Sequence, residues 1–76
     1  MSFGPFRVKA KFGEQRIATS ATAMAFVRSL QPPLRTSYHW KVAERMIHCA
    51  WMSAEDEAMA EQAFMIALEM DGLLIP

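Results

Sequence analysis

The residue types best suited to chemistry gather in residues 37–51, which read Ser-Tyr-His-Trp-Lys-Val-Ala-Glu-Arg-Met-Ile-His-Cys-Ala-Trp. This stretch contains both histidines, the only cysteine, the only tyrosine and both tryptophans of the chain. Imidazole and thiolate groups are common ligands of zinc, and a thiolate is also a nucleophile. The stretch is therefore either a metal or catalytic site or part of a hydrophobic core.

The spacing of these side chains argues against a shared site. Two metal ligands on one helix need a separation of three or four residues, whereas His39 and His48 are nine positions apart. At about 100° per residue the two imidazoles point to opposite faces of a helix, and Cys49 points about a quarter turn from either. We therefore expect no metal site, no cofactor and no catalytic residue here.

The same helical step places most of the apolar side chains of this stretch on one face. Trp40 and Trp51 fall within about 20° of one another, and His39 lies on the same arc. This arrangement is typical of a helix that packs on a core, which is the interpretation we favour. The alternative is an aromatic groove, lined by these three side chains, that binds a small apolar ligand.

The apolar face is wider than one core contact requires. Extended by Val42 and Cys49, it spans about 200°, whereas a stripe of about 100° is usual for a surface helix. The helix predicted over residues 54–71 also has a stripe of alanine, phenylalanine and leucine with methionine and isoleucine beside it. Two such faces leave more apolar surface than a domain this small can cover.

We interpret the surplus as a protein interface, most simply that of a homodimer. The candidate interface residues are Val42, Met46, Cys49, Met59, Met65, Ile66 and Met70. Met65 is included because its neighbours on the helical wheel, Glu61, Gln62 and Glu69, are polar. An unidentified protein is a further candidate partner. The alternative is that a sheet and another helix sandwich both helices and leave no surplus surface.

A β-hairpin is predicted ahead of the helices. Residues 6–12 alternate between apolar and basic side chains, as a half-buried strand does. We expect the chain to reverse at Gly13 and Glu14 and to return over residues 15–18, with Ile17 facing the core.

The first helix begins at an N-cap, Thr19 or Ser20, and ends before the proline pair at positions 32 and 33. Proline cannot continue a helix because it lacks the N–H group and clashes with the preceding turn. Residues 31–36 are therefore expected to form a loop.

Two longer helices follow this loop. Thr36 or Ser37 caps the second, which continues to about Met52. Ser53 caps the third, and Gly72 ends it because glycine suits the left-handed conformation after a helix.

The predicted fold is a single α+β domain over residues 1–76. An N-terminal β-hairpin packs on three helices in the order β-β-α-α-α. The apolar residues 73–75 are able to add a short C-terminal strand beside the hairpin or to plug the core.

Length and composition restrict the function further. The 76 residues are 53% apolar and 21% charged, which is typical of one small globular domain. One cysteine cannot form an internal disulfide, so association with a second copy is the remaining way to stabilise so small a core. The chain has no apolar leader at its start and no window of 18 apolar residues, so we expect a soluble, cytoplasmic protein with no membrane contact.

The net charge is zero, but its two signs are separated along the chain. Residues 1–43 carry seven Lys and Arg against Glu14, and residues 44–76 carry seven Asp and Glu against Arg45. Acidic residues near the start of the last helix are favoured by its dipole. The alternative is an electrostatic contact between the two halves of neighbouring copies.

Binding of nucleic acid or another polyanion is an alternative function. The candidate residues are Arg7, Lys9, Lys11 and Arg16, which form a basic strip on the outer face of the hairpin. Basic side chains on a strand also protect it from pairing with other edges. The helix over residues 54–71 carries six acids and no base, so nucleic acid is the less favoured partner.

The last helix carries a resemblance to a known family. The segment Ala-Glu-Gln-Ala-Phe-Met-Ile-Ala-Leu-Glu-Met-Asp-Gly-Leu at positions 60–73 is similar to the Ala-Arg-x-Ala-Phe-x-x-Ala pattern, closing in glycine and an aliphatic residue, of domain-of-unknown-function family 982. The chain resembles these small bacterial proteins over nearly its whole length. It departs from them at Gln31, Ile47, Ser53 and Glu61, where the family has Trp, Cys, Gly and Arg. The resemblance implies the fold and a bacterial origin, and it implies no activity.

No glycine-rich phosphate loop and no Ser-His-Asp spacing occurs in the sequence, so we expect no enzyme. The function predicted is a non-enzymatic protein-interaction module that self-associates through the apolar faces of its second and third helices. Polyanion binding and small-ligand binding are the two alternatives.

Overall fold

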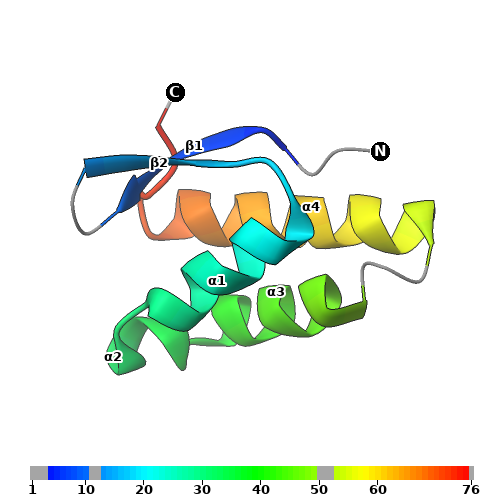
Figure 1. Cartoon of the computed structure of the whole chain (residues 1–76). Coiled ribbons are helices and arrows are strands. Elements are labelled where there is room, and N and C mark those ends of the chain that lie inside the picture. Colours follow the sequence, from blue (N-terminus) through cyan, green and yellow to red (C-terminus); the bar gives the residue numbers. More distant parts are fainter. Residues whose placement is uncertain (1–3, 11–12, 50–52, 76) are drawn as a thin grey trace.

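The computed structural model describes residues 4–10, 13–49 and 53–75, and it confirms the α+β fold with a β-hairpin followed by helices (Figure 1). The elements are β1 (Phe6–Ala10), β2 (Gly13–Ile17), α1 (Ser20–Ser29), α2 (Pro32–Arg35), α3 (Tyr38–Cys49) and α4 (Ala54–Met70). In Figure 1 the hairpin lies along one side of α4 and α3 lies along another, while α1 passes from the hairpin toward the start of α3.

The hairpin forms because apolar and charged side chains alternate along β1. Val8 and Ile17 are fully buried on the inner face, as expected for Ile17. Arg7 and Lys9 are exposed on the outer face. The strands pair in antiparallel register, with Val8 opposite Gln15.

The predicted reversal at Gly13 and Glu14 is wrong. Both residues belong to β2, because Gly13 already pairs with Ala10 of β1. The alternating pattern of residues 6–12 gives no information on where the first strand ends, so the turn was placed too late. Lys11 lies outside the described residues.

The helix N-caps follow the local sequence. The Thr19 hydroxyl accepts the Thr22 N–H at 3.1 Å, and the Thr22 hydroxyl accepts the Thr19 N–H at 3.1 Å, which is a complete capping box. The Ser53 hydroxyl accepts the Asp56 N–H at 3.0 Å at the start of α4. Thr19, one of two candidates for its cap, and Ser53 are thus confirmed.

The end of α4 turns the chain back toward the hairpin. Gly72 adopts a φ of 67°, its N–H donates to the Glu69 carbonyl, and the Leu73 N–H donates to the Leu68 carbonyl at 2.8 Å. These two bonds form a Schellman motif, which confirms glycine in the left-handed position after the helix.

The segment after Gly72 pairs with β1, as one of the two sequence-based expectations proposed. The Lys9 N–H donates to the Leu73 carbonyl at 2.8 Å, and the Ile75 N–H donates to the Arg7 carbonyl at 2.8 Å. Leu74 thereby forms an isolated bridge with Val8. The C-terminal strand is a single bridge residue within the described part of the chain.

Residues 31–36 were expected to form a loop, and the structure instead contains the one-turn helix α2. Its first two residues, Pro32 and Pro33, occupy positions where no N–H is needed within the helix, so the pair starts a helix as readily as it ends one. The Ser37 hydroxyl donates to the Leu34 carbonyl and so ties α2 to the start of α3.

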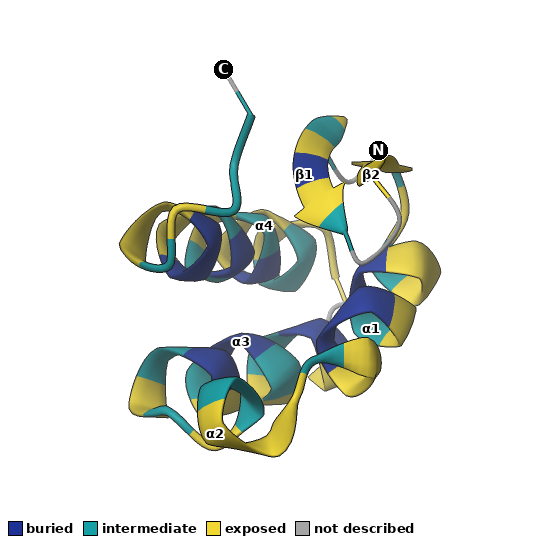
Figure 2. Ribbon diagram, turned by 90° about the vertical axis from the view of Figure 1, so that its left-hand side faces the viewer, coloured by how far each residue is buried: buried dark blue, intermediate teal, exposed yellow. Residues whose placement is uncertain are grey.

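The core lies between the hairpin, α1 and the facing sides of α3 and α4 (Figure 2). Its centre is an aromatic cluster in which the ring centroids of Phe26, Trp40 and Phe64 lie 5.9 to 6.2 Å apart. The fully or almost fully buried residues are Val8, Ile17, Ala23, Phe26, Val27, Trp40, Ala43, Ile47, Ala60, Phe64, Ala67 and Leu68.

Candidate functional site

An open apolar groove of about 480 Å³ runs between α3 and α4. Its lining residues are Tyr38, His39, Val42, Met46, Met59, Gln62, Ala63, Ile66 and Met70. In Figure 2 the hairpin and α1 lie together on one side of the molecule, and none of the described elements covers the opposite flank of α3 and α4. The groove volume lies in the range of about 300 to 1,000 Å³ that is usual for binding sites.

The groove holds the large apolar side chains that are exposed in the described part of the chain. Among the described residues, the large apolar side chains that stay exposed are Tyr38 at 82%, Met59 at 54%, Ile66 at 46% and Met70 at 64%. All four line this groove. Single exposed apolar residues are common on protein surfaces, whereas a group of them in one groove is a candidate for an interaction site.

On α3, core and groove occupy adjacent sectors of one broad apolar face. Trp40 and Ala43 are buried against the core, whereas His39, Val42 and Met46 line the groove. The two sets are offset by one residue, which is about 100° of helical rotation. The wide apolar arc of this helix therefore serves two surfaces.

The same division occurs on α4. Ala60 and Ala67 are fully buried, and each follows directly after a groove residue, Met59 or Ile66. Ala63 lies at the border, half-buried and lining the groove. Because Ala60 and Ala67 are small, α3 and α4 can approach closely, and the larger side chains of Met59 and Ile66 are left at the rim.

A polar cluster lies at one end of the groove, beside the lining residues His39 and Met70. The Asp71 carboxylate, at the C-cap of α4, accepts hydrogen bonds from the Trp40 indole N–H and from His39 Nε2, the latter at 2.9 Å. Both donors belong to the first turn of α3. The carboxylate therefore fixes the start of α3 beside the end of α4.

The surroundings of Asp71 set its pKa. Burial of the carboxyl group by itself raises the pKa, but the hydrogen bonds from His39 and Trp40 and the charge of His39 favour the ionised form. Together they outweigh burial, and the pKa of Asp71 lies below its usual value. The cluster thus holds a carboxylate rather than a neutral acid.

The structure brings together most of the predicted interface residues. Val42, Met46, Met59, Ile66 and Met70 all line the groove, as does His39 from the predicted aromatic groove. Tyr38 and Gln62 were missed, although the helical step places Tyr38 beside Val42 and Gln62 beside Ile66.

Three other predicted site residues lie elsewhere. Cys49 is exposed at the end of α3 and lines a different depression, and Met65 is half-buried outside the groove. Trp40 is fully buried and lines no groove, because Phe26 and Phe64 pack around its ring and Asp71 binds its N–H. Trp51 lies outside the described residues.

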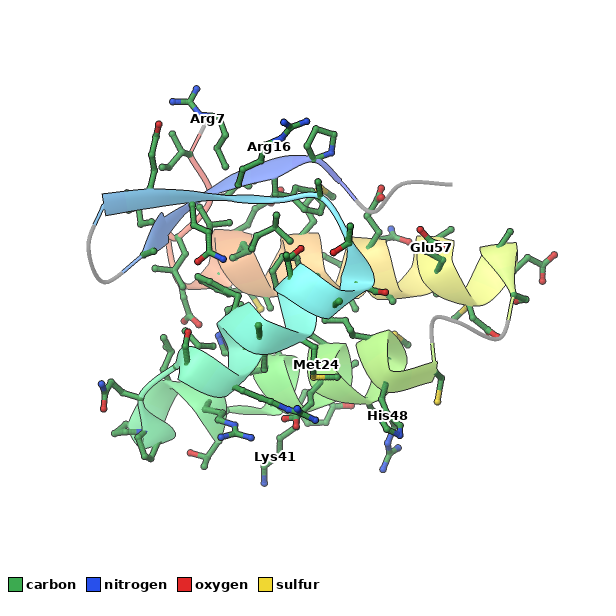
Figure 3. All side chains as sticks on the ribbon, viewed as in Figure 1. Arg7, Arg16, Met24, Lys41, His48 and Glu57 are labelled. Carbon is green, nitrogen blue, oxygen red and sulfur yellow. The ribbon has the colours of Figure 1, made fainter. Side chains whose placement is uncertain are left out.

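The depression that includes Cys49 lies between α1 and α3 and has a volume of about 320 Å³. It is lined by Met24, Arg28, Lys41, Glu44, Arg45, His48 and Cys49. Lys41 and His48 extend from the same side of α3, with Met24 of α1 above them (Figure 3). The Glu44 carboxylate lies 3.7 Å from the Arg35 guanidinium. This basic grouping did not emerge from the sequence, because Arg28 comes from another helix.

The outer face of the hairpin carries the predicted basic strip. Arg7 and Arg16 are paired across the strands and point away from the helices in Figure 3. The Arg7 guanidinium donates to both oxygens of the Glu14 carboxylate, at 2.9 and 3.1 Å. Lys9 also lies opposite Glu14. The acid of β2 therefore offsets part of the positive charge on this face.

Within the described ranges, no three His, Cys, Asp or Glu side chains are grouped so that they could hold a metal ion. Nor does any helix of the described residues have the length and apolar character needed to span a membrane.

Comparison with family models found no match, and neither the curated proteins nor the solved structures contain a match to the chain. The resemblance to domain-of-unknown-function family 982 stays a prediction from the sequence.

Proposed function

We propose that the protein is a non-enzymatic interaction module and that the groove between α3 and α4 binds a second copy of the chain. The observation that supports this proposal most strongly is that Tyr38, Met59, Ile66 and Met70, all largely exposed, line one groove. Covering such side chains removes apolar surface from water, which is the main favourable term in protein association.

A second copy fits this groove better than a small ligand does. The walls are two helices whose edges differ in charge. On α4, Glu55 and Glu69 lie seven positions before and after the lining residue Gln62. On α3, Arg45 lies seven positions after the lining residue Tyr38 and also lines the depression between α1 and α3. A partner with both edges can match each with its opposite, whereas a small apolar molecule matches neither. Methionine side chains also adapt their shape to a facing surface. A cytoplasmic location of the dimer is part of this proposal.

Sedimentation velocity of the variant Ile66→Glu tests the proposal. Because Ile66 is 46% exposed, the chain tolerates glutamate at this position as a monomer, but a dimer would have to bury the charge. We expect the wild-type chain to dimerise. In the variant, we expect the dissociation constant of the dimer to rise at least about 100-fold, which corresponds to about 2.7 kcal/mol.

The matched control is Ala58→Glu, which places the same charge at an exposed position of α4 that does not line the groove. This control should dimerise as the wild-type chain does. A wild-type chain that stays monomeric up to millimolar concentration would contradict the proposal, and so would an Ile66→Glu variant that dimerises normally.

A further inference from the structure

The groove residues are spaced as the contact positions of a coiled coil. On α3, His39, Val42 and Met46 are separated by three and then four residues. On α4, the groove residues Met59, Ala63, Ile66 and Met70 are separated by four, three and four residues. Alternation of three and four is the heptad pattern that packs one helix against another. Each helix therefore presents a seam that suits another helix.

The structure also shows which residues of the two seams lie at the same level. The His39–Asp71 hydrogen bond places the start of α3 beside the end of α4, and the two helices run in opposite directions (Figure 1). At about 1.5 Å per residue from this point, Val42 lies about 4.5 Å along α3 and Ile66 about 7.5 Å along α4, and the corresponding values for Met46 and Ala63 are about 10.5 and 12 Å. Each of these pairs therefore lies within about 3 Å of the same level.

From these seams we propose that two copies form an antiparallel four-helix bundle in which α3 of one copy packs against α4 of the other. The two-fold axis then runs parallel to the helices, so each level is kept and Val42 of one copy faces Ile66 of its partner. This inference rests on the proposed self-association and adds the arrangement of the two copies. Each neighbouring pair of helices in such a bundle is antiparallel, as is common in four-helix bundles.

The charges at the edges of the groove select this arrangement. Glu55, Gln62 and Glu69 recur every seven residues along the outer edge of α4, whereas Tyr38 and Arg45 occupy the equivalent edge of α3. The other symmetric arrangement packs α4 on α4 and brings the two acidic edges together. Like charges placed opposite one another disfavour a contact, so the acidic edge of α4 prefers the edge that carries Arg45.

Disulfide cross-linking between single-cysteine variants tests the arrangement. Cys49→Ser removes the native thiol, and Val42→Cys or Ile66→Cys then adds one thiol on α3 or on α4. We expect a mixture of the two variants to form the mixed disulfide dimer at least about tenfold faster than either variant alone forms its own disulfide dimer, because only facing positions bring the Cα atoms within about 7 Å. Mass spectrometry under non-reducing conditions distinguishes the three products.

A control mixture combines Val42→Cys with Ala58→Cys, whose thiol lies on α4 outside the groove, and should give little mixed product. Faster cross-linking within the separate Val42→Cys or Ile66→Cys samples would overturn the proposed arrangement and leave self-association standing. The absence of any cross-link in variants that sediment as dimers would also overturn it. Failure of self-association itself is recognised separately, because the wild-type chain then sediments as a monomer.

Discussion

The groove between α3 and α4 and the outer face of the hairpin are both exposed, but they differ in what a partner could add. On the hairpin, the Arg7 guanidinium already binds Glu14, and Lys9 and Arg16 are exposed to water, which solvates their charges well. In the groove, the apolar side chains of Met59, Ile66 and Met70 are exposed, and water solvates them less favourably than it solvates charged groups.

This difference shows that exposure alone does not identify a binding surface. A partner of the hairpin would have to displace water and Glu14 from Arg7, and would so exchange existing polar interactions for similar ones. A partner of the groove covers apolar side chains and leaves the Asp71 cluster at its end intact. If the proposed self-association occurs, most of its favourable free energy should therefore come from the groove.

The largest change in the free energy of unfolding is expected at the polar end of the groove. We expect Asp71→Asn to lower the free energy of unfolding by about 1 to 2 kcal/mol. Both hydrogen bonds go to the Oδ2 atom of Asp71, and an amide oxygen in its place can accept them but lacks the charge that strengthens them. Urea unfolding followed by circular dichroism measures the change. Glu69→Gln is the matched control, since Glu69 is exposed on α4 near the same end, and it should change the value by less than about 0.5 kcal/mol.

The pH dependence of this effect follows from the lowered pKa of Asp71. A carboxyl group whose pKa is lower in the folded chain stabilises it above the usual aspartate value of 3.8, and this contribution disappears as the pH falls through the folded value. The difference between wild type and Asp71→Asn should therefore be full at pH 7 and should shrink below pH 3.8. A stability difference between the two chains that stays constant from pH 7 to below pH 3.8 would show that the Asp71 charge does not contribute to it.

The smallest effect is expected on the hairpin. Arg7→Gln removes an ion pair whose side chains are 59% and 53% exposed, and pairs in such positions contribute about 0 to 1 kcal/mol. We expect unfolding to change by less than about 0.5 kcal/mol and the dimerisation constant, measured by sedimentation, to stay unchanged. If Arg7→Gln weakened the dimer as much as Ile66→Glu does, the groove would not be the main contact surface.

Local signals were sufficient to predict several features of the fold. Ser53 and Gly72 set the limits of α4 through local geometry. The Ser53 hydroxyl caps the start of the helix, and Gly72 adopts the left-handed backbone conformation after its end. Turn position was less predictable, since alternation along the first strand continues past Ala10 without marking its end. The helix at Pro32 was missed because a proline pair is compatible with both a loop and a first helical turn.

The groove was partly predictable for a related reason. A helical wheel gives the angle of each side chain around the helix. It therefore indicates that the apolar faces of α3 and α4, which include Val42, Met59, Ile66 and Met70, are wider than one core can cover. It cannot indicate which sector a neighbouring element covers. Trp40 became part of the core through its contacts with α1 and α4, and these contacts are decided by the tertiary fold.

The most direct test of the groove as the contact surface is a methyl and amide NMR titration of the wild-type chain against its own concentration. We predict that the methyl resonances of Met59, Ile66 and Met70 shift or broaden as the concentration rises, while the amide resonances of Arg7 and Arg16 stay in place. Shifts confined to the hairpin, or no change at either surface up to millimolar concentration, would contradict the account.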